Sequence, residues 1–228
     1  MFLSALALAA AISNPQTAAN APISADPLNT LALAETFDCA PTDDACRQAE
    51  FRLRYEADQG VRRDETLRRL CAELGRAGID EACAESLLGE IDARNTEAVR
   101  PMVRTGKWPN WSGTPARGVW LIVQHARTAD GKFDTDFMVE ALPFLLAGVQ
   151  AGDLDPQDYA RTADRALLDQ GKLQKFGTIR VCRGGAFDVA TVDPENVVEA
   201  NRRDLGFEIS FAAARRFMDG QCQKEASR

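Results

Sequence analysis

His125 is the only histidine in the 228 residues, and its imidazole is the side chain best suited to acid–base chemistry. A histidine works as a general base when a carboxylate orients its ring. Asp164, followed directly by Arg165, is the best carboxylate partner that the sequence offers. An enzyme of this kind would use His125 and Asp164 as catalytic residues, with Arg62 or Arg165 holding an anionic group of the substrate. The alternative is a buried imidazole that serves packing, and for a lone histidine on an apolar helix we favour that alternative.

Metal and cofactor motifs are missing from the sequence. One histidine excludes HExxH zinc sites and any metal site with two histidines. The acidic segment 130–136 is similar in charge to a calcium loop, but Lys132 stands at its third position and Thr135 replaces the required glycine. Since Walker, GxGxxG and Gly-x-Ser-x-Gly patterns do not occur either, we predict neither a bound metal nor a cofactor.

Two polar pairs have helical spacing. Asp58 and Arg62 are four residues apart, and Asp92 and Asn95 are three apart, so each pair shares one helix face. Spacing alone favours ordinary solvated pairs, each worth about 0.3–0.5 kcal/mol.

The six cysteines and the N-terminus indicate export. Residues 2–12 are apolar, and Thr17-Ala18-Ala19 fits signal-peptidase cleavage, although no basic residue precedes them. We therefore predict a signal peptide at 1–19, with a buried N-terminal helix as the alternative, and a linker at 20–42. An even number of cysteines in an exported chain favours disulfides over reduced, buried thiols. Local geometry favours pairing in sequence order, which leaves no thiol for catalysis: Cys39 with Cys46, Cys71 with Cys83, and Cys182 with Cys222. The expected location is periplasmic or secreted.

Composition narrows the class of protein. Hydrophobic residues make up 45% and charged residues 27%, which is typical of a globular chain. A formal net charge of −7 argues against a nucleic-acid-binding protein and against a polybasic protein of the membrane surface. No apolar run approaches the roughly 20 residues of a membrane-spanning helix.

Hydrophobic periodicity and punctuation by glycine and proline predict a mainly α fold, a helical bundle-like domain with one β-hairpin between the last helices. The expected helices cover 43–74, 80 onward with a kink or end at Pro101, 114–126, 136–149 with a kink at Pro143, 155–171, a short one from 193, and 207–218. The hairpin strands are expected at 176–182 and 186–192. We predict one domain over 43–220 and a tail at 221–228.

Several motifs together resemble a family. In order they are Asp58-Gln59-x-x-Arg62, Asp92-x-x-Asn95, Gly106-x-Trp108-Pro109, the helix 120–126 with Gln124-His125-Ala126, Asp164-Arg165, and Phe176-Gly177-Thr178. The set is similar to a bacterial domain-of-unknown-function family with DQxxR, GWP, WLxxQHAD, AYLTDR and YGTQ-type motifs.

The resemblance spans roughly residues 51–217 and implies one polar cluster of Asp58, Arg62, Gln124, His125, Asp164 and Arg165. Two positions depart from the family pattern: Ile179 replaces its glutamine, and Arg127 replaces its aspartate. An altered or lost site would follow if those groups served one.

Our leading functional hypothesis is an exported domain that binds a small molecule or a partner protein around this cluster, with Asp58, Arg62, Gln124 and Arg165 as ligand-binding residues. The acid–base enzyme is the alternative, and a purely structural envelope protein is a third possibility.

Overall fold

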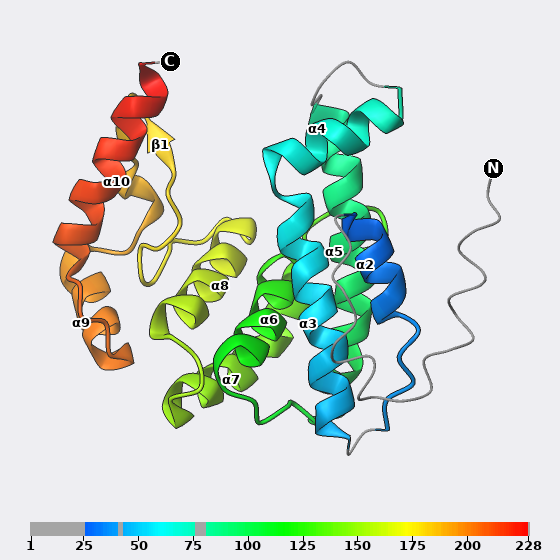
Figure 1. The fold of residues 1–228 in the computed structure, drawn as a ribbon. Coiled ribbons are helices and arrows are strands. Elements are labelled where there is room, and N and C mark those ends of the chain that lie inside the picture. The colour runs from blue at the N-terminus through cyan, green and yellow to red at the C-terminus, as the bar shows by residue number, and fades with distance from the viewer. Residues whose placement is uncertain (1–25, 41–42, 76–80, 228) are drawn as a thin grey trace. The chain divides into compact units, whose positions relative to one another are not determined.

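The structure is a computed structural model that describes residues 26–40, 43–75 and 81–227. The predicted signal peptide and the first part of the predicted linker lie outside these residues. The described chain is mainly helical with one two-stranded antiparallel hairpin near its C-terminal end, which confirms the predicted fold class (Figure 1). Within it, none of the helices combines the length and the apolar character that crossing a bilayer requires.

The chain divides into two compact units, where a single domain was predicted. Among the described residues, the first unit contains those up to Val99 together with 117–133, and the second contains 100–116 and 134–227.

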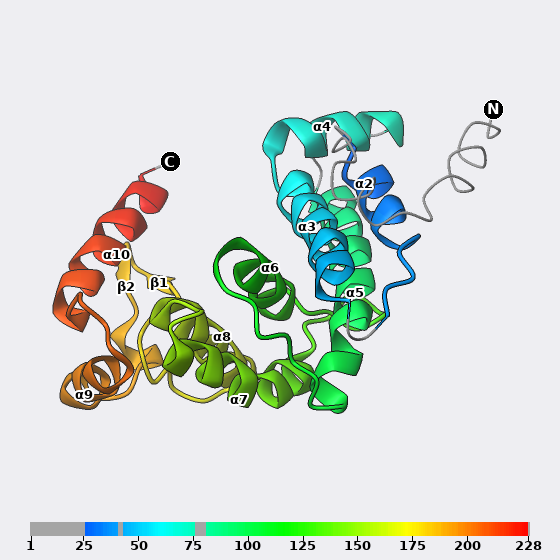
Figure 2. The same ribbon diagram turned by 60° about the horizontal axis from the view of Figure 1, so that its bottom comes forward.

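Helices α2 to α6 supply the first unit. Their bounds are Pro27–Ala34 for α2, Asp44–Val61 for α3, Asp64–Glu73 for α4, Glu81–Arg104 for α5 and Gly113–Gln124 for α6. The last turn of α5, which continues past Pro101, and the first residues of α6 belong to the second unit. Figures 1 and 2 show α2 beside α3 and α5, and one apolar cluster joins Leu31, Val61, Leu70 and Ile91 from α2, α3, α4 and α5.

Helix α2 corrects the linker prediction for 20–42. Asp26 caps the helix by accepting a hydrogen bond from the backbone N–H of Leu28 at 2.9 Å, and Pro27 occupies the first helical position. Leu31 is fully buried. The segment 27–34 is therefore part of the core of the first unit.

A break after Val61 corrects the prediction of one helix over 43–74. The backbone is extended at Arg63, with ψ 128°, and α4 starts afresh at Asp64. Asp64 and Glu65 lie in the first turn of α4, where the helix dipole favours negative charge. The break places Arg62 at the C-terminal end of α3.

Four helices and the hairpin form most of the second unit. They are α7 (Thr135–Ala151), α8 (Pro156–Asp169), α9 (Glu195–Leu205) and α10 (Phe211–Ala226). As expected, α7 passes through Pro143, and α8 begins at Pro156 with an aspartate cap. The predictions of a last helix at 207–218 and a tail from 221 are wrong in their bounds. Ser210 caps α10, and the helix continues to Ala226 with Cys222 buried on it.

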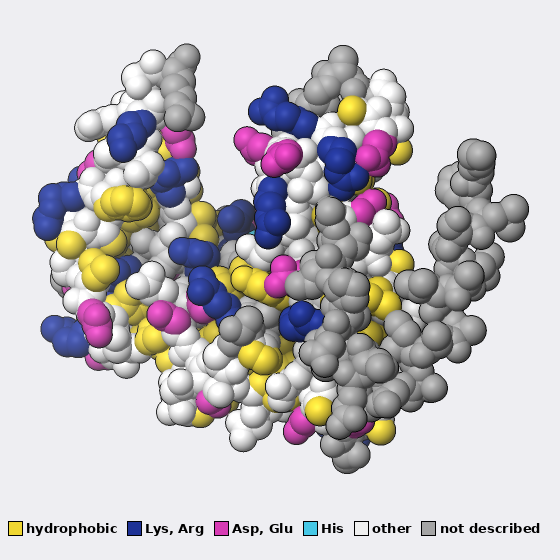
Figure 3. Space-filling view, viewed as in Figure 1, with side chains coloured by type: hydrophobic (Ala, Val, Ile, Leu, Met, Phe, Trp, Pro, Cys, Tyr) yellow, Lys and Arg dark blue, Asp and Glu magenta, His cyan; other side chains and the backbone are white. Residues whose placement is uncertain are grey.

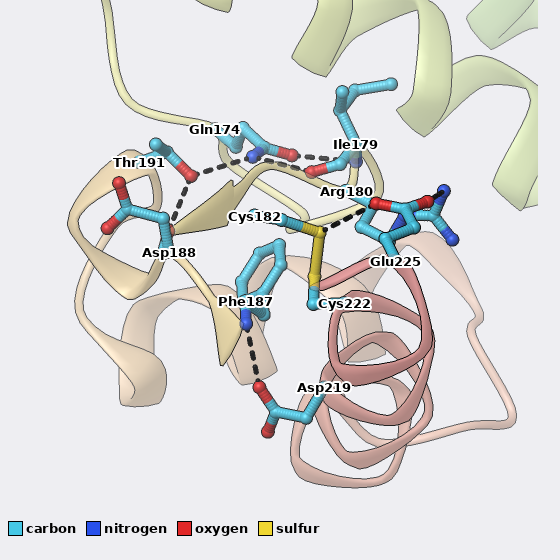
Figure 4. Close-up of a disulfide and its surroundings, with 10 residues drawn as sticks. All are labelled: Gln174, Ile179, Arg180, Cys182, Phe187, Asp188, Thr191, Asp219, Cys222 and Glu225. Carbon is cyan, nitrogen blue, oxygen red and sulfur yellow. Dashed lines mark hydrogen bonds and ion pairs between the residues drawn. A yellow bond between two sulfur atoms is a disulfide. The ribbon is translucent and has the colours of Figure 1, made fainter. Parts of the chain in front are cut away.

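The hairpin is shorter than predicted. Strands β1 (Cys182–Arg183) and β2 (Ala186–Phe187) have two residues each, and residues 189–191 form a 3-10 helix. Before β1, the buried side-chain amide of Gln174 forms hydrogen bonds with the backbone, as a neighbouring strand would (Figure 4). It bonds both the N–H and the carbonyl of Ile179, at 2.8 and 3.0 Å, and it also donates to the Thr191 hydroxyl.

The three disulfides pair in sequence order, as local geometry predicted, and the described chain has no free cysteine. Cys39–Cys46 closes the loop before α3, and Cys71–Cys83 joins α4 to α5. Cys182–Cys222 ties β1 to α10, with sulfur atoms directly between the two elements in Figure 4. The backbone N–H of Phe187 also donates to Asp219 on α10, so the hairpin is held to this helix at two points.

Candidate functional site

Polar side chains of the first unit meet where α3 and α6 end against the middle of α5. Asp58 and Arg62 come from the end of α3, Asp92 comes from α5, and His125 and Arg127 directly follow α6. We call these five residues the His125 cluster. Arg62 and Arg127 follow the C-terminal ends of α3 and α6, where the helix dipole favours positive charge.

A buried carboxylate orients His125. Nδ1 of the imidazole lies 2.9 Å from Oδ1 of Asp58, whose side chain is only 1% exposed, whereas that of His125 is 24% exposed. An ionised carboxylate only accepts hydrogen bonds, so Nδ1 carries a proton, and whenever the ring is neutral its lone pair is on Nε2. Gln59 donates to the second oxygen of Asp58 at 2.6 Å. This arrangement fixes the tautomer of the ring.

Arg62 joins the two carboxylates of the cluster. Its Nη1 lies 3.0 Å from Asp58 Oδ1, and its Nη2 lies 2.7 Å from Asp92 Oδ1. Nη1 also donates to the backbone carbonyl of Asp58 at 2.8 Å, so the guanidinium caps its own helix. Since Asp58 and Asp92 are 1% and 2% exposed, this positive charge compensates two negative charges that burial would otherwise make costly.

Arg127 places a second cation beside Asp92. Its Nε lies 3.4 Å from Asp92 Oδ2, its Nη1 contacts both Glu85 and the carbonyl of Gly131, and its guanidinium lies over the Phe133 ring. A second positive charge therefore lies next to the buried carboxylate of Asp92.

The two carboxylates have opposite pKa shifts. Burial by itself would raise the pKa of Asp58, but the hydrogen bond and charge of His125, the charge of Arg62 and the Gln59 amide outweigh it, so this pKa lies below its ordinary value of 3.8. Burial dominates for Asp92 and raises its pKa above 3.8, although Arg62 opposes the rise. On acidification, Asp92 therefore takes up a proton before Asp58 does.

One group of ligand atoms in the described chain is close enough to hold a metal ion. Asp58, Asp92 and His125 each offer one atom, and the three atoms lie within 4.8 Å of one another. The Arg62 guanidinium, however, already bonds both carboxylates, and Arg127 adds a second positive charge. A metal ion here would have to displace Arg62 against that charge, so these residues do not fit a metal centre as they stand.

Asp164 has a different partner from the one that the sequence suggested. It lies in the second unit, fully buried on α8. Its Oδ1 accepts from the backbone N–H groups of Lys175 and Phe176, at 2.8 and 3.0 Å, and its Oδ2 accepts from the N–H and hydroxyl of Thr178, at 2.8 and 2.7 Å. Four donors satisfy this carboxylate. The carboxylate that orients His125 is Asp58, and the expected pairing of His125 with Asp164 is corrected accordingly.

The turn held by Asp164 also explains the Phe176-Gly177-Thr178 motif. Gly177 has φ +60°, in the left-handed region, and a Cβ built on it would lie 2.3 Å from Cε2 of Phe211. Only glycine fits there without moving the ring. Asp164 and Gly177 therefore shape the chain between α8 and the hairpin.

The other predicted site residues divide between the two units. Gln124 is buried on α6 in the first unit, and Arg165 is half-buried on α8 in the second. Of the predicted ligand-binding residues, only Asp58 and Arg62 belong to the His125 cluster. The preference for solvated helix pairs at Asp58 and Arg62 and at Asp92 and Asn95 is wrong, because Asp58, Asp92 and Asn95 are buried.

Sequence reasoning missed the role of Asp92 and Arg127. The motif Asp92-x-x-Asn95 was the available signal, because two polar residues on the face of α5 that also carries Ile91 and Leu87 lie close to the apolar stripe. Asn95 bonds the carbonyl and the guanidinium of Arg54 on α3, at 3.4 Å each, so it extends the polar contact along the two helices.

Comparisons with known proteins give a family and no activity. A family model described as "Family of unknown function (DUF6624)" matches residues 47–220, which agrees with the resemblance to an uncharacterised family. No curated protein and no solved structure matches the chain.

Proposed function

We propose that the chain, which belongs to the DUF6624 family of unknown function, is an exported protein that binds a small ligand at the exposed edge of His125 and exchanges a proton with it. The family assigns no reaction, so the proposal is based on the geometry of the first unit. The observation that carries this proposal is the 2.9 Å contact between Nδ1 of His125 and the buried Asp58 carboxylate. His125 is the proton acceptor, and Asp58 is a positioning residue.

The exposure of the ring supports this role. Asp58 uses Nδ1, so that bond leaves Nε2 for another partner, and about a quarter of the His125 side chain is exposed, 24%. A general base needs an unprotonated nitrogen that reaches its substrate, together with a group that holds the ring in place. The contact with Asp58 and the partial exposure of the side chain support this role for His125.

The surroundings of the imidazole limit the kind of reaction. Both terminal nitrogens of Arg62 bond the carboxylates of the cluster, so Arg62 is a poor choice for holding an anionic substrate group. Every cysteine of the described chain is in a disulfide, so a thiolate nucleophile is not available there. These constraints favour proton transfer to or from a bound molecule, or activation of a water molecule, over a cysteine-based covalent intermediate.

A ligand-binding module without chemistry is the second candidate. Arg62 and Arg127 compensate Asp58 and Asp92, so the buried charges of the cluster balance without any ligand. Such a network also fixes one packing arrangement of α3, α5 and α6. In this case the exposed edge of His125 accepts a hydrogen bond from the ligand, and no proton moves.

Export to the periplasm or beyond the cell is part of the proposal. Three disulfides support it, because disulfides persist in oxidising compartments and are rare in the cytosol. Cell fractionation followed by mass mapping without reduction is the test. Free thiols at all six positions in protein from its native host would contradict export.

The lone histidine makes a direct test of the site possible. Diethylpyrocarbonate acylates unprotonated, accessible imidazole nitrogen, so this chain should gain one imidazole adduct in its native state. Protein whose His125 reacts only after unfolding would exclude the acid–base proposal, because Nε2 would then be out of reach of a substrate.

Turnover separates the two candidates. Wild type, His125→Gln and Asp58→Asn are compared on p-nitrophenyl acetate, phosphate and glycoside reporters, and a metabolite library is screened for compounds that slow the acylation of His125. Acid–base catalysis predicts that His125→Gln lowers the rate about 100-fold or more. A compound that protects His125 and is recovered unchanged, with no reporter turned over, supports the binding module instead.

A further inference from the structure

The second unit contains a cavity whose charge is opposite to that of the whole chain. It has a volume of about 450 Å³ and is formed by α8, the turn at 177–180, α9, the segment that follows α9, and α10. Its described lining includes Arg161, Arg180 and Arg202 and no aspartate or glutamate. In a chain with a formal net charge of −7, three arginines around one cavity mark a place where negative charge is favoured.

Arg202 is a buried cation without a carboxylate partner among the described residues. It is only 4% exposed, and its guanidinium donates to backbone carbonyls, to Phe176 at 2.9 Å and to Ile209 at 2.9 and 3.3 Å. The Phe207 ring lies 4.1 Å from its central carbon. These carbonyl groups accept hydrogen bonds but carry no formal charge. The carboxylates of Glu199 and Asp164 act on Arg202 from a distance, but neither forms an ion pair with it. Arg202 therefore contributes positive charge to the cavity wall.

The other two arginines lie at the open side. Arg161 is exposed on α8 and makes no ion pair within the described residues, whereas Arg180 pairs with Glu225 on α10. Figure 4 shows Arg180 and Glu225 beside the Cys182–Cys222 disulfide. Arg161 is thus the cation that a ligand reaches most easily.

Large apolar side chains complete the cavity. Phe217 is 68% exposed and Ile209 is 52% exposed, and both line it together with Phe207 and Met218. In Figure 3, hydrophobic and basic side chains are interspersed with acidic ones over α9 and α10 on the face shown. Exposed apolar groups beside cations at a concave surface are typical of a site that takes an amphiphile with a negative head.

The cavity walls are fixed in advance. The disulfide and the hydrogen bond from the Phe187 N–H to Asp219 hold the hairpin to α10, and Asp164 fixes the turn that carries Gly177. A rigid site avoids part of the ordering cost of binding.

We propose that this cavity binds a small amphiphile with one carboxylate head and an unbranched apolar tail, with Arg161 and Arg202 facing the carboxylate and Phe207, Ile209 and Phe217 contacting the tail. A carboxylate is preferred to a neutral head because an arginine without a carboxylate partner gains a charge-assisted hydrogen bond from it. The site is separate from the His125 cluster, which lies in the first unit, and the two proposals stand or fall independently.

Calorimetric titration of the full mature chain with decanoate, below its micelle concentration, tests the proposal. We expect saturable binding of about one decanoate per chain, and at least about tenfold weaker binding of decanol and of decyltrimethylammonium, because a hydrogen bond to a charged group contributes about 1.5–3 kcal/mol. Butyrate, which has the head with little tail, should bind more weakly than decanoate as well.

Two exposed substitutions test the site without touching the core. Arg161→Glu and Phe217→Ser should each weaken decanoate binding about tenfold or more. Arg203→Glu is the matched control, because Arg203 is an exposed arginine of α9 outside the cavity lining, and it changes the net charge by the same amount. Thermal melting of each variant confirms that the fold is kept.

Three outcomes would overturn the proposal. The first is no saturable decanoate binding to wild type, and the second is equal binding of decanoate by Arg161→Glu and Arg203→Glu. The third is binding to phosphatidylglycerol vesicles without binding of free decanoate, which would make this face a lipid-surface contact rather than a carboxylate site.

Discussion

Arg62 bonds two buried carboxylates at once, so its replacement by methionine tests the His125 cluster most directly. The substitution keeps much of the aliphatic stem and removes the charge between Asp58 and Asp92, which are 1% and 2% exposed. Removing one partner of a buried ion pair typically costs 3–5 kcal/mol, because the remaining charge stays desolvated. Since the Arg62 side chain is itself 24% exposed, we expect a loss near the lower end, about 3 kcal/mol in the free energy of unfolding.

Arg69 supplies a matched control in the same unit. It pairs with Glu73 at 2.9 Å, four residues away, just as Arg62 pairs with Asp58 at 3.0 Å. The side chains of Arg69 and Glu73 are 42% and 56% exposed, so Arg69→Met should cost only about 0.5 kcal/mol. The two pairs have the same spacing and nearly the same length, and they differ in burial.

Urea titration followed by the imidazole proton NMR signals is the assay. His125 is the only histidine, so these signals report unfolding of the first unit alone, even if the second unit unfolds separately. Arg62→Lys should be intermediate, since one ammonium group cannot form the same fork to two carboxylates. Adding Asp92→Asn to Arg62→Met should recover part of the loss, because one of the two unpaired charges is removed. If Arg62→Met costs no more than Arg69→Met, the cluster is not the buried charge network described above.

Three further outcomes are expected. Gly177→Ala should lower the free energy of unfolding clearly more than Gly171→Ala does, as measured by thermal and urea unfolding. Both glycines have positive φ, so either alanine adds about 1–2 kcal/mol of backbone strain, but only at Gly177 does the new Cβ meet an aromatic ring. Equal losses of stability would contradict the contact with the ring. Asp58→Asn should be less stable than wild type at neutral pH. The difference in urea midpoint should close as pH falls through and below 3.8, because a carboxyl with a lowered pKa contributes stability only while it is ionised. A difference independent of pH would refute the lowered pKa of Asp58. Replacing Cys182 and Cys222 together by serine should lower the free energy of unfolding by about 4 kcal/mol, because the disulfide closes a loop with sequence separation 40 and so reduces the entropy of the unfolded chain. Urea titration of the second unit is the measurement. A change below about 1 kcal/mol would mean that the Phe187–Asp219 hydrogen bond and the surrounding packing hold the hairpin without the covalent link.

Local signals in the sequence were enough for most helix starts and ends. Helix α7 ends at Gly152, which adopts a left-handed backbone, and α8 begins with the capping carboxylate of Asp155 and the fixed φ of Pro156. Each boundary thus depends on properties of single residues. The break at Arg62–Arg63 carried no such mark, since neither proline nor a side-chain cap occurs there. It exists because α4 packs against the core of the first unit, a contact that involves residues far apart in the chain.

The candidate site was only half predictable for a similar reason. Asp58, Arg62 and His125 were chosen by residue type, and they do meet. Their common partner Asp92 looked like a surface residue, because helical spacing indicates which face a residue occupies but not how deeply that face is buried. Asp164 was chosen as the partner of His125 for its charge. Its four backbone and hydroxyl donors come from the turn at 175–178, whose Phe176-Gly177-Thr178 motif gave no sign of a contact with Asp164.

The amino-acid sequence determined the mainly helical class, the family and the identity of the lone imidazole, and it favoured the sequential disulfides, because each of these depends on local spacing or on residue type. Tertiary structure alone decided which carboxylate faces that imidazole, that Arg62 and Arg127 occupy the space between the acids, and that three arginines gather around an apolar cavity in an acidic chain. Those outcomes depend on the free energy of desolvating charges, which is set by packing between distant segments and leaves no periodic trace along the chain.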